Sequence, residues 1–227
     1  MKNKEENMQS IAFLKICLSG NDKSYYLWNN AQKYYDKLNH ALEDIKKEEQ
    51  PASYLYFSFI SLSSATLEYS LNLLYAMYFF NKFGVPLYKR YLESHKSISF
   101  RNKLFILPHV LSEGKLVINE NCRYVESLNT LISIRNDLLH NSEKAQEFEF
   151  PDIHAIVEGN NLIVPIEYAQ VEWEISPKDN TIESLNKKLC IEVGEAMSSF
   201  YKMVLVPYID FGTLEENDFI RAYLREE

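Results

Sequence analysis

Apolar residues recur at helical spacing along most of the 227-residue chain. The two longest periodic segments are Lys23–Glu49, which Pro51 follows, and Tyr54–Phe83, which Gly84-Val85-Pro86 follows; both endings are helix-stop signals. Tyr54–Phe83 is apolar on two faces, which is typical of a helix surrounded by protein. Three shorter helices are predicted at Phe100–Leu111, Cys122–Ser142 and Ile182–Tyr208. The pattern predicts an all-α fold, a helical bundle with Tyr54–Phe83 at its centre.

The period of the pattern changes between the fourth and fifth predicted helices. The stretch "HAIVEGNNLIVPIE" has two β-branched runs around Gly-Asn-Asn, which predicts a β-hairpin. "VEWEIS" then alternates apolar and acidic residues, as a half-buried strand does. We therefore expect a small β-hairpin or meander insertion at about residues 150–180, before the last core helix. The predicted organisation is an N-terminal helical addition (1–50), a helical bundle with the β insertion (51–210) and a loosely packed acidic C-terminal tail (211–227).

The composition supports a globular helical protein with an acidic surface. Hydrophobic residues make up 46% of the chain, and Gly (6) and Pro (7) are scarce. The formal net charge of −8 disfavours promiscuous binding to nucleic acid. Charge is unevenly spread, because Lys82–Arg123 contains eight Lys/Arg against three Asp/Glu, whereas residues 143–183 contain ten acidic residues against two lysines. The first run could form a basic face for a phosphate backbone, and the simpler interpretation is that both runs are solvated surfaces.

One apolar segment, Tyr54–Phe80, is long enough to span a membrane. It contains Glu68, Asn72 and five Ser residues, and a charge near the bilayer centre costs about 3 kcal/mol or more. We therefore expect a buried helix and no membrane association.

The cysteines and the N-terminal residues favour a cytoplasmic protein. Cys17, Cys122 and Cys190 are widely separated and show neither disulfide-like pairing nor metal-ligand spacing. The stretch "MKNKEENMQS" lacks the apolar core of a signal peptide. Free thiols, a cytoplasmic location and the absence of a metal or cofactor are expected.

The residues best suited to chemistry are Arg135, Asn136 and His140, which lie within six positions near the end of the fourth predicted helix. On a helix, Asn136 and His140 share a face, and the longer Arg135 side chain can swing back from one side. Cleavage of RNA by its own 2′-OH requires a proton acceptor near neutral pH, which histidine supplies. It also requires a cation for the phosphoryl oxygens, which arginine supplies.

A purely structural explanation of the same residues stays open. Cationic side chains near a helix C-terminus interact favourably with its partial negative charge. Asn141 is a suitable residue just past the helix end, and Arg135 could pair with a nearby acid.

The stretch "SIRNDLLHN" resembles the R-N-x-x-x-H signature of the HEPN superfamily, and the order of the predicted helices agrees. The resemblance implies a four- or five-helix bundle, with the motif near the end of the third core helix. It also implies a homodimer in which two copies of the motif face each other across a cleft. Many members are metal-independent ribonucleases of toxin–antitoxin, abortive-infection and other defence systems, whose partners include antitoxins and nucleotidyltransferases.

By the same resemblance, Arg135 is expected to stabilise the phosphoryl charge, and His140 to act as general base or acid. Asn136 would orient one of them or the 2′-OH. The expected activity is a metal-independent endoribonuclease that leaves 2′,3′-cyclic phosphate ends. Some members of the superfamily are catalytically inactive, so the alternative is a HEPN-like module that binds a nucleotide or a partner protein.

Other polar residues carry weaker signals. Glu68 is the lone charge in the central apolar helix. Because a buried carboxylate needs a partner, Arg135 is a candidate partner for it, and the alternative is an exposed Glu68 at a helix kink. Arg101, with Asn102, repeats the Arg-Asn pair without a following histidine and is assigned to the basic run. Four other histidines lack a matching acid or thiol nearby in sequence and are expected to be structural or surface residues: His40, His95, His109 and His154.

Overall fold

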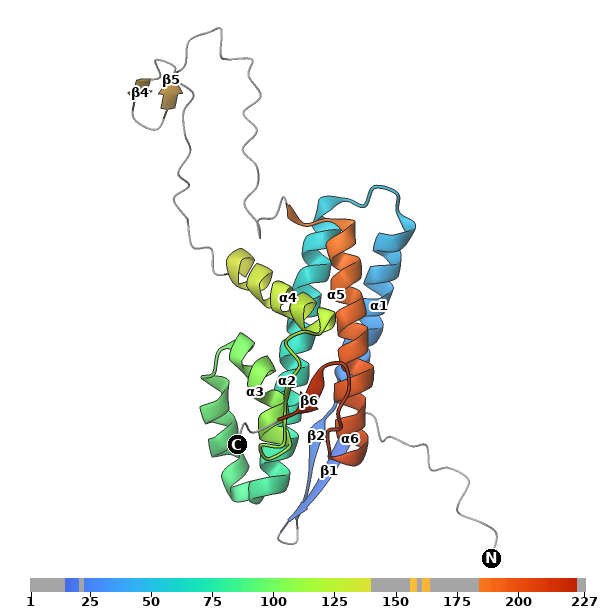
Figure 1. The fold of residues 1–227 in the computed structure, drawn as a ribbon, viewed down its shortest axis with the longest axis vertical. Helices are drawn as coiled ribbons and strands as arrows, with labels where there is room; N and C mark the ends of the chain where they lie inside the picture. Colours follow the sequence, from blue (N-terminus) through green and yellow to red (C-terminus); the bar gives the residue numbers. More distant parts are fainter. Residues whose placement is uncertain (1–14, 21–22, 140–155, 159–160, 164–183, 224–227) are drawn as a thin grey trace, which may run out of the picture.

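The structure is a computed structural model that describes residues 15–20, 23–139, 156–158, 161–163 and 184–223. Three predictions lie outside the described residues: the catalytic role of His140, the structural or surface role of His154, and the "VEWEIS" strand. In the described residues the fold is mostly helical, and the predicted helical bundle is confirmed (Figure 1). Its six α-helices are α1 (Ala31–Lys47), α2 (Ser53–Lys96), α3 (Phe100–Leu111), α4 (Arg123–Leu139), α5 (Lys187–Phe200) and α6 (Val206–Phe211).

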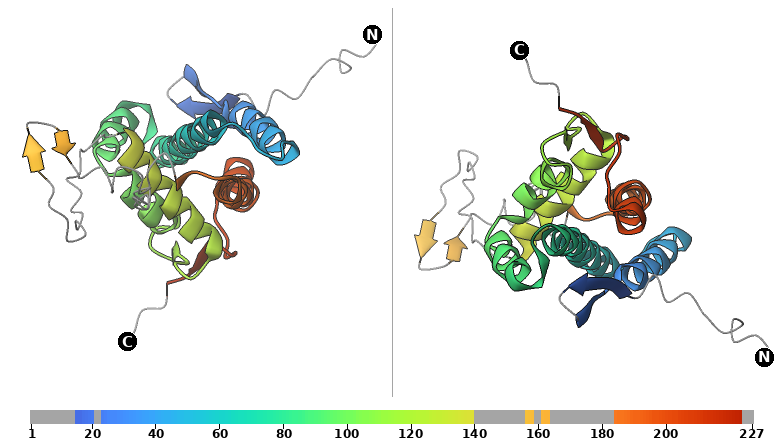
Figure 2. Two further views of the ribbon diagram at one scale, coloured as in Figure 1. Left: turned by 90° about the horizontal axis from the view of Figure 1, so that it is seen from above. Right: turned by 90° about the horizontal axis from the view of Figure 1, so that it is seen from below.

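Helix α2 is the centre of the bundle, as its two apolar faces predict. It packs against α1, α3, α4 and α5, while α4 lies across the bundle at an angle to α2 and α5 (Figures 1 and 2). In α2, the hydroxyls of Ser63, Ser64 and Thr66 donate to the backbone carbonyls four residues earlier, at 2.7 to 2.9 Å. These polar residues are therefore buried with their hydrogen bonds made. No helix in the described part of the chain is both long and apolar enough to cross a membrane.

The predicted end of the central helix is a sharp kink followed by more helix. Gly84 has φ 66° and ψ 178°, outside the helical region, and the helix resumes as far as Lys96. The Phe83 and Tyr91 rings stack with centroids 3.9 Å apart, and His95 packs on Tyr75 at 3.5 Å. Because residues on either side of Gly84 pair in this nested order, the second half of α2 runs back along the first.

The predicted helix over Lys23–Glu49 is wrong at its beginning. Lys23–Trp28 is a strand, β2, which pairs antiparallel with β1 (Lys15–Gly20). The sequence of β2, KSYYLW, is rich in aromatic residues that favour strands. The helix begins only at Ala31, whose N–H donates to the Asn29 side chain at 3.0 Å. The N-terminal addition therefore contains a β-hairpin as well as α1.

The predicted loosely packed tail is also wrong for its described part. Ile220–Ala222 forms β6, which pairs antiparallel with β3 (Leu116–Ile118), the strand between α3 and α4. Phe219 is fully buried between the rings of Tyr124 and Phe200. An acidic composition did not reveal this packing, because two apolar residues suffice to anchor the segment.

The predicted β-hairpin before the last core helix is confirmed, with β4 (Ile156–Glu158) antiparallel to β5 (Asn161–Ile163). The last predicted helix is a nearly continuous run, in which a π-helical turn at Tyr201–Leu205 joins α5 to α6. It begins at Lys187, because the Asn186 side chain caps the backbone N–H of Leu189 at 3.0 Å.

Candidate functional site

Helix α4 presents the candidate site from a firmly anchored position. Val125, Leu128, Leu131 and Ile132 are fully buried against the core. This apolar stripe fixes the rotation of the helix about its axis, so that its polar residues face outward. Arg135 and Asn136 lie among its last five described residues.

Arg135 is held between a carboxylate and an amide. Its Nη2 lies 3.6 Å from Oε2 of Glu68 on α2, and its Nη1 donates to Oδ1 of Asn136 at 3.1 Å. The guanidinium also lies 5.8 Å from the centre of the Phe100 ring, within cation–π range. The predicted pairing of Glu68 with Arg135 is confirmed. Arg135 and Asn136, two of the three predicted site residues, are neighbours in the sequence, and their side chains contact each other.

The third predicted residue, His140, lies outside the described residues. Whether it joins Arg135 and Asn136 therefore stays a prediction.

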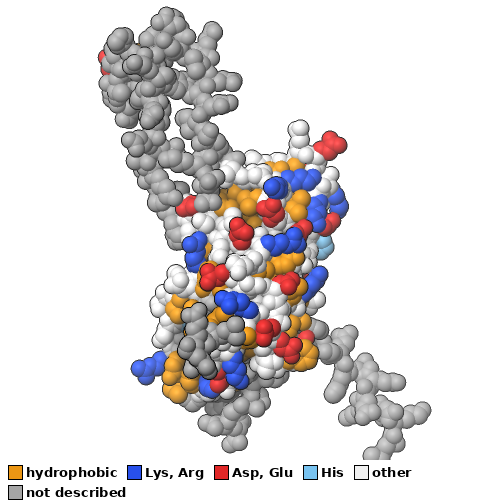
Figure 3. All heavy atoms as spheres, viewed as in Figure 1, with side chains coloured by type: hydrophobic (Ala, Val, Ile, Leu, Met, Phe, Trp, Pro, Cys, Tyr) orange, Lys and Arg blue, Asp and Glu red, His pale blue; other side chains and the backbone are white. Residues whose placement is uncertain are grey.

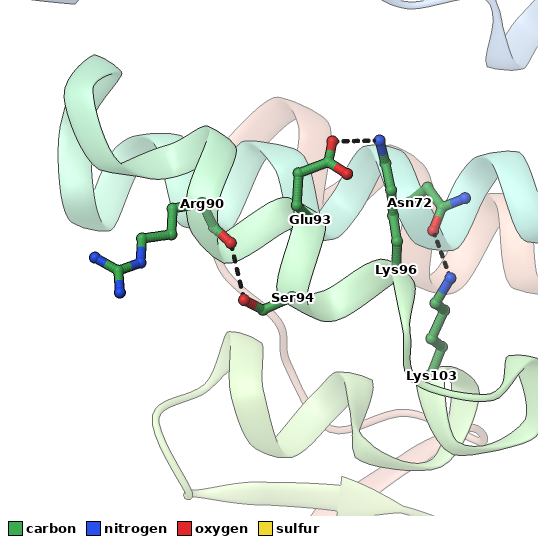
Figure 4. A network of polar contacts seen from close by, with 6 residues as sticks. All are labelled: Asn72, Arg90, Glu93, Ser94, Lys96 and Lys103. Carbon is green, nitrogen blue, oxygen red and sulfur yellow. Dashed lines mark hydrogen bonds and ion pairs between the residues drawn. The ribbon is translucent and has the colours of Figure 1, made fainter.

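A buried lysine beside this group was missed by sequence reasoning. Lys103 on α3 is only 3% exposed, and its Nζ donates to Oδ1 of Asn72 at 3.2 Å. Figure 4 shows this bond together with the Glu93–Lys96 ion pair. Asn72 is one turn after Glu68 on α2, so both side chains lie on the same face. Burial lowers the pKa of Lys103, and the nearby Glu68 charge opposes that effect.

The burial of Lys103 had a signal in the sequence. It shares the inward stripe of α3 with three apolar residues at helical spacing, which are Phe100, Leu104 and Leu107. A stripe of this kind predicts a buried face. Because Lys103 belongs to the basic run Lys82–Arg123, it was instead interpreted as part of a solvated surface.

Two of the eight cations in the predicted basic run form close ion pairs. Lys82 pairs with Glu113 and Lys96 with Glu93, each at 2.6 Å. Figure 3 shows Lys and Arg side chains interspersed with Asp and Glu over the face in view. Arg135 and the buried Lys103 both lie near the Glu68 carboxylate.

The histidines in the described part of the chain fit their structural or surface assignment. His40 and His109 are exposed. His95 is 6% exposed, and its Nε2 has no hydrogen-bond partner among the described residues. Burial, reinforced by the charge of Lys103, lowers the pKa of His95 to about 4, so this ring is neutral near pH 7.

The described residues contain no group of three or more His, Cys, Asp and Glu side chains arranged to hold a metal ion. Cys122 and Cys190 are buried free thiols, and burial raises the pKa of Cys190 to about 12. This thiol is therefore protonated and unreactive near neutral pH.

Comparison of the chain with protein-family models, with curated proteins and with solved structures found no match.

Proposed function

We propose that this protein is a metal-independent endoribonuclease whose site consists of Arg135, Asn136 and His140. The observation that carries the proposal is the arrangement of Arg135, which Glu68 and Asn136 hold at the end of α4. A guanidinium fixed by two neighbours is oriented before a phosphate arrives, so little ordering remains to be done on binding.

In the proposed reaction, His140 accepts the proton of the 2′-OH while the 2′-oxygen forms a bond to the adjacent phosphorus. The bond from phosphorus to the 5′-oxygen breaks, and that oxygen takes a proton from water, while His140 returns the proton it accepted to the solvent. The products are a 2′,3′-cyclic phosphate and a 5′-OH end. Arg135 stabilises the charge on the phosphoryl oxygens, and Asn136 keeps the guanidinium in place.

The resemblance to the HEPN superfamily supports a homodimer in which two motifs face one cleft. It also supports a cytoplasmic role in a toxin–antitoxin or phage-defence system, with an antitoxin or a nucleotidyltransferase as partner. Size-exclusion chromatography with light scattering would test the dimer, and a monomer at assay concentration would remove the shared cleft from the proposal.

The activity is tested by incubating single-stranded RNA with the purified protein in EDTA and identifying the product ends. We expect cyclic phosphate and 5′-OH ends, with at least a hundredfold loss of rate in His140→Ala and Arg135→Lys. Arg135→Lys keeps a cation beside Glu68 but loses the forked donor geometry. His40→Ala and Arg90→Ala, at exposed positions, are the matched controls. Equal cleavage by all four variants would refute the site.

The alternative is a catalytically inactive HEPN-like module that binds a nucleotide or a partner protein. It is favoured by the Glu68 carboxylate, which already compensates the charge of Arg135, and by the net charge of −8. Nucleotide binding without any cleavage of RNA would identify this alternative.

A further inference from the structure

In the half of α2 that follows Gly84, a single described side chain is buried. This returning half (residues 85–96) is helical and joins the first half at a bend, where Gly84 has φ 66° and ψ 178°. Among its described side chains, His95 is buried, Leu92 is half-buried and the others are exposed. Of the described side chains, His95 therefore contributes most to holding this helix against the bundle.

The polar side chains of the returning half bond within it. The Ser94 hydroxyl donates to the backbone carbonyl of Arg90 at 3.0 Å, and Lys96 pairs with Glu93 at 2.6 Å (Figure 4). Within the described residues, no side chain of the returning half forms a hydrogen bond or an ion pair with another element. Polar contacts therefore add little to its attachment.

The described contacts that hold the returning half are aromatic. The His95 ring lies 3.5 Å from the Tyr75 ring and 5.5 Å from the Phe79 ring, centroid to centroid, and Tyr91 stacks on Phe83 at 3.9 Å. The Nε2 atom of His95 is buried and has no hydrogen-bond partner among the described residues. Such a pocket suits a neutral imidazole and offers nothing to a charged one.

A proton on His95 would place a charge in this pocket without a counter-ion. On the first half of α2, Tyr75 is neutral, because burial raises the pKa of its hydroxyl. On α3, the charge of the buried Lys103 repels an imidazolium. On the returning half itself, Glu93 and Lys96 are exposed and pair with each other. No carboxylate in the described part of the chain forms an ion pair with His95, and an unpaired buried charge is costly.

Local release of the returning half removes that cost without unfolding the bundle. The helices α1, α4 and α5 pack on α2, whereas the returning half is held by a few rings beyond the Gly84 bend, and backbone bends of this kind serve as hinges. From these observations we infer that the returning half is an acid-released strap, which opens as a unit when His95 takes up a proton. Opening uncovers the Tyr75 and Phe79 rings. The inference goes beyond the proposed ribonuclease activity and does not depend on it.

The test is hydrogen–deuterium exchange of the full chain at pH 7 and pH 5, followed by mass spectrometry of its peptides. We expect peptides from the returning half to be less protected than peptides from residues 67–74. Because the pKa of His95 lies at about 4 in the fold and near 6.5 when exposed, their protection factor should fall roughly twentyfold between the two pH values. A low concentration of urea should hardly change it, because a local opening exposes little surface.

His95→Phe and His40→Phe are the matched variants. His95→Phe keeps a ring against Tyr75 but takes up no proton, so the protection factor of its returning half should change little between pH 7 and pH 5. His40→Phe, at an exposed position, should behave like the parent. Equal pH dependence of the parent and His95→Phe would overturn the inference.

The parent protein alone also decides the question. If its returning half exchanges with the protection and the urea dependence of residues 67–74, the segment opens only in global unfolding and there is no strap. These measurements involve no RNA, so a failure of the ribonuclease proposal leaves their outcome unchanged, and the reverse also holds.

Discussion

His95 makes the stability of the fold depend on pH in a window that a single substitution can remove. Its ring lies 3.5 Å from the Tyr75 ring, centroid to centroid, in a site where it is 6% exposed. Burial and the nearby Lys103 charge lower its pKa from 6.5 to about 4. The unfolded chain therefore binds a proton at a higher pH than the folded one. Stability from the neutral ring is complete above pH 6.5 and is lost as the pH falls toward 4.

The size of the effect follows from the same pKa values. One pKa unit corresponds to about 1.36 kcal/mol, so the interval from 6.5 to about 4 corresponds to about 3 kcal/mol when fully expressed. The range from pH 7 to pH 5 covers only part of the interval between the two pKa values. Over this range His95 should lower the free energy of unfolding by roughly 2 kcal/mol.

The assay is urea unfolding at pH 7 and pH 5 for the parent and His95→Phe. Phenylalanine keeps an aromatic ring against Tyr75 but does not titrate. Carboxylates lose the same stability in both proteins, so the parent should lose about 2 kcal/mol more than His95→Phe between the two pH values. His40→Phe, at an exposed position, should behave like the parent. Equal pH dependence of the parent and His95→Phe would refute the assignment.

Two further predictions test the packing. Gly194→Ala places a Cβ against the buried Leu42 side chain; overpacking should outweigh the gain in helix propensity and lower stability by about 1 kcal/mol in urea unfolding. Adding Leu42→Val should cost less in that variant than in the parent, and strict additivity would contradict the clash. Phe219→Ala should lose about 3–5 kcal/mol in the same assay, because the ring is fully buried. Phe211→Ala, at a 77% exposed position, should change stability by less than about 0.5 kcal/mol; equal losses would contradict the anchoring of β6.

A helix was predictable where the sequence marks both its periodic apolar positions and the residues that begin and end it. The bounds of α3 match the prediction of Phe100–Leu111, because Ser99 caps its start and Ser112 ends its periodic pattern. The strand pair β3–β6 was not predictable, because its two short strands lie about a hundred residues apart and neither carries a strong pattern alone. The return of α2 after Gly84 was missed because a Gly-Val-Pro sequence ends most helices.

One contact of the candidate site, the pairing of Glu68 with Arg135, could be inferred from the sequence because a carboxylate in an apolar environment is stabilised by a cation. The hypothesis that the lone carboxylate of an apolar helix pairs with a cation identified the Glu68–Arg135 pair, although the Glu68 side chain is 37% exposed and its alternative, an exposed position, is partly met as well. Lys103 was missed because a lysine seldom lies on a buried stripe.

The hydroxyl groups of α2 have a consequence for how this chain can diverge in evolution. Ser63, Ser64 and Thr66 direct their hydrogen bonds into their own helix, so neighbouring helices meet small side chains rather than polar ones. Exchange among serine, alanine and cysteine at Ser63 and Ser64 therefore leaves the interhelical distances unchanged. A leucine there would separate the helices. Among homologues, side-chain volume rather than polarity should be the inherited property of these positions.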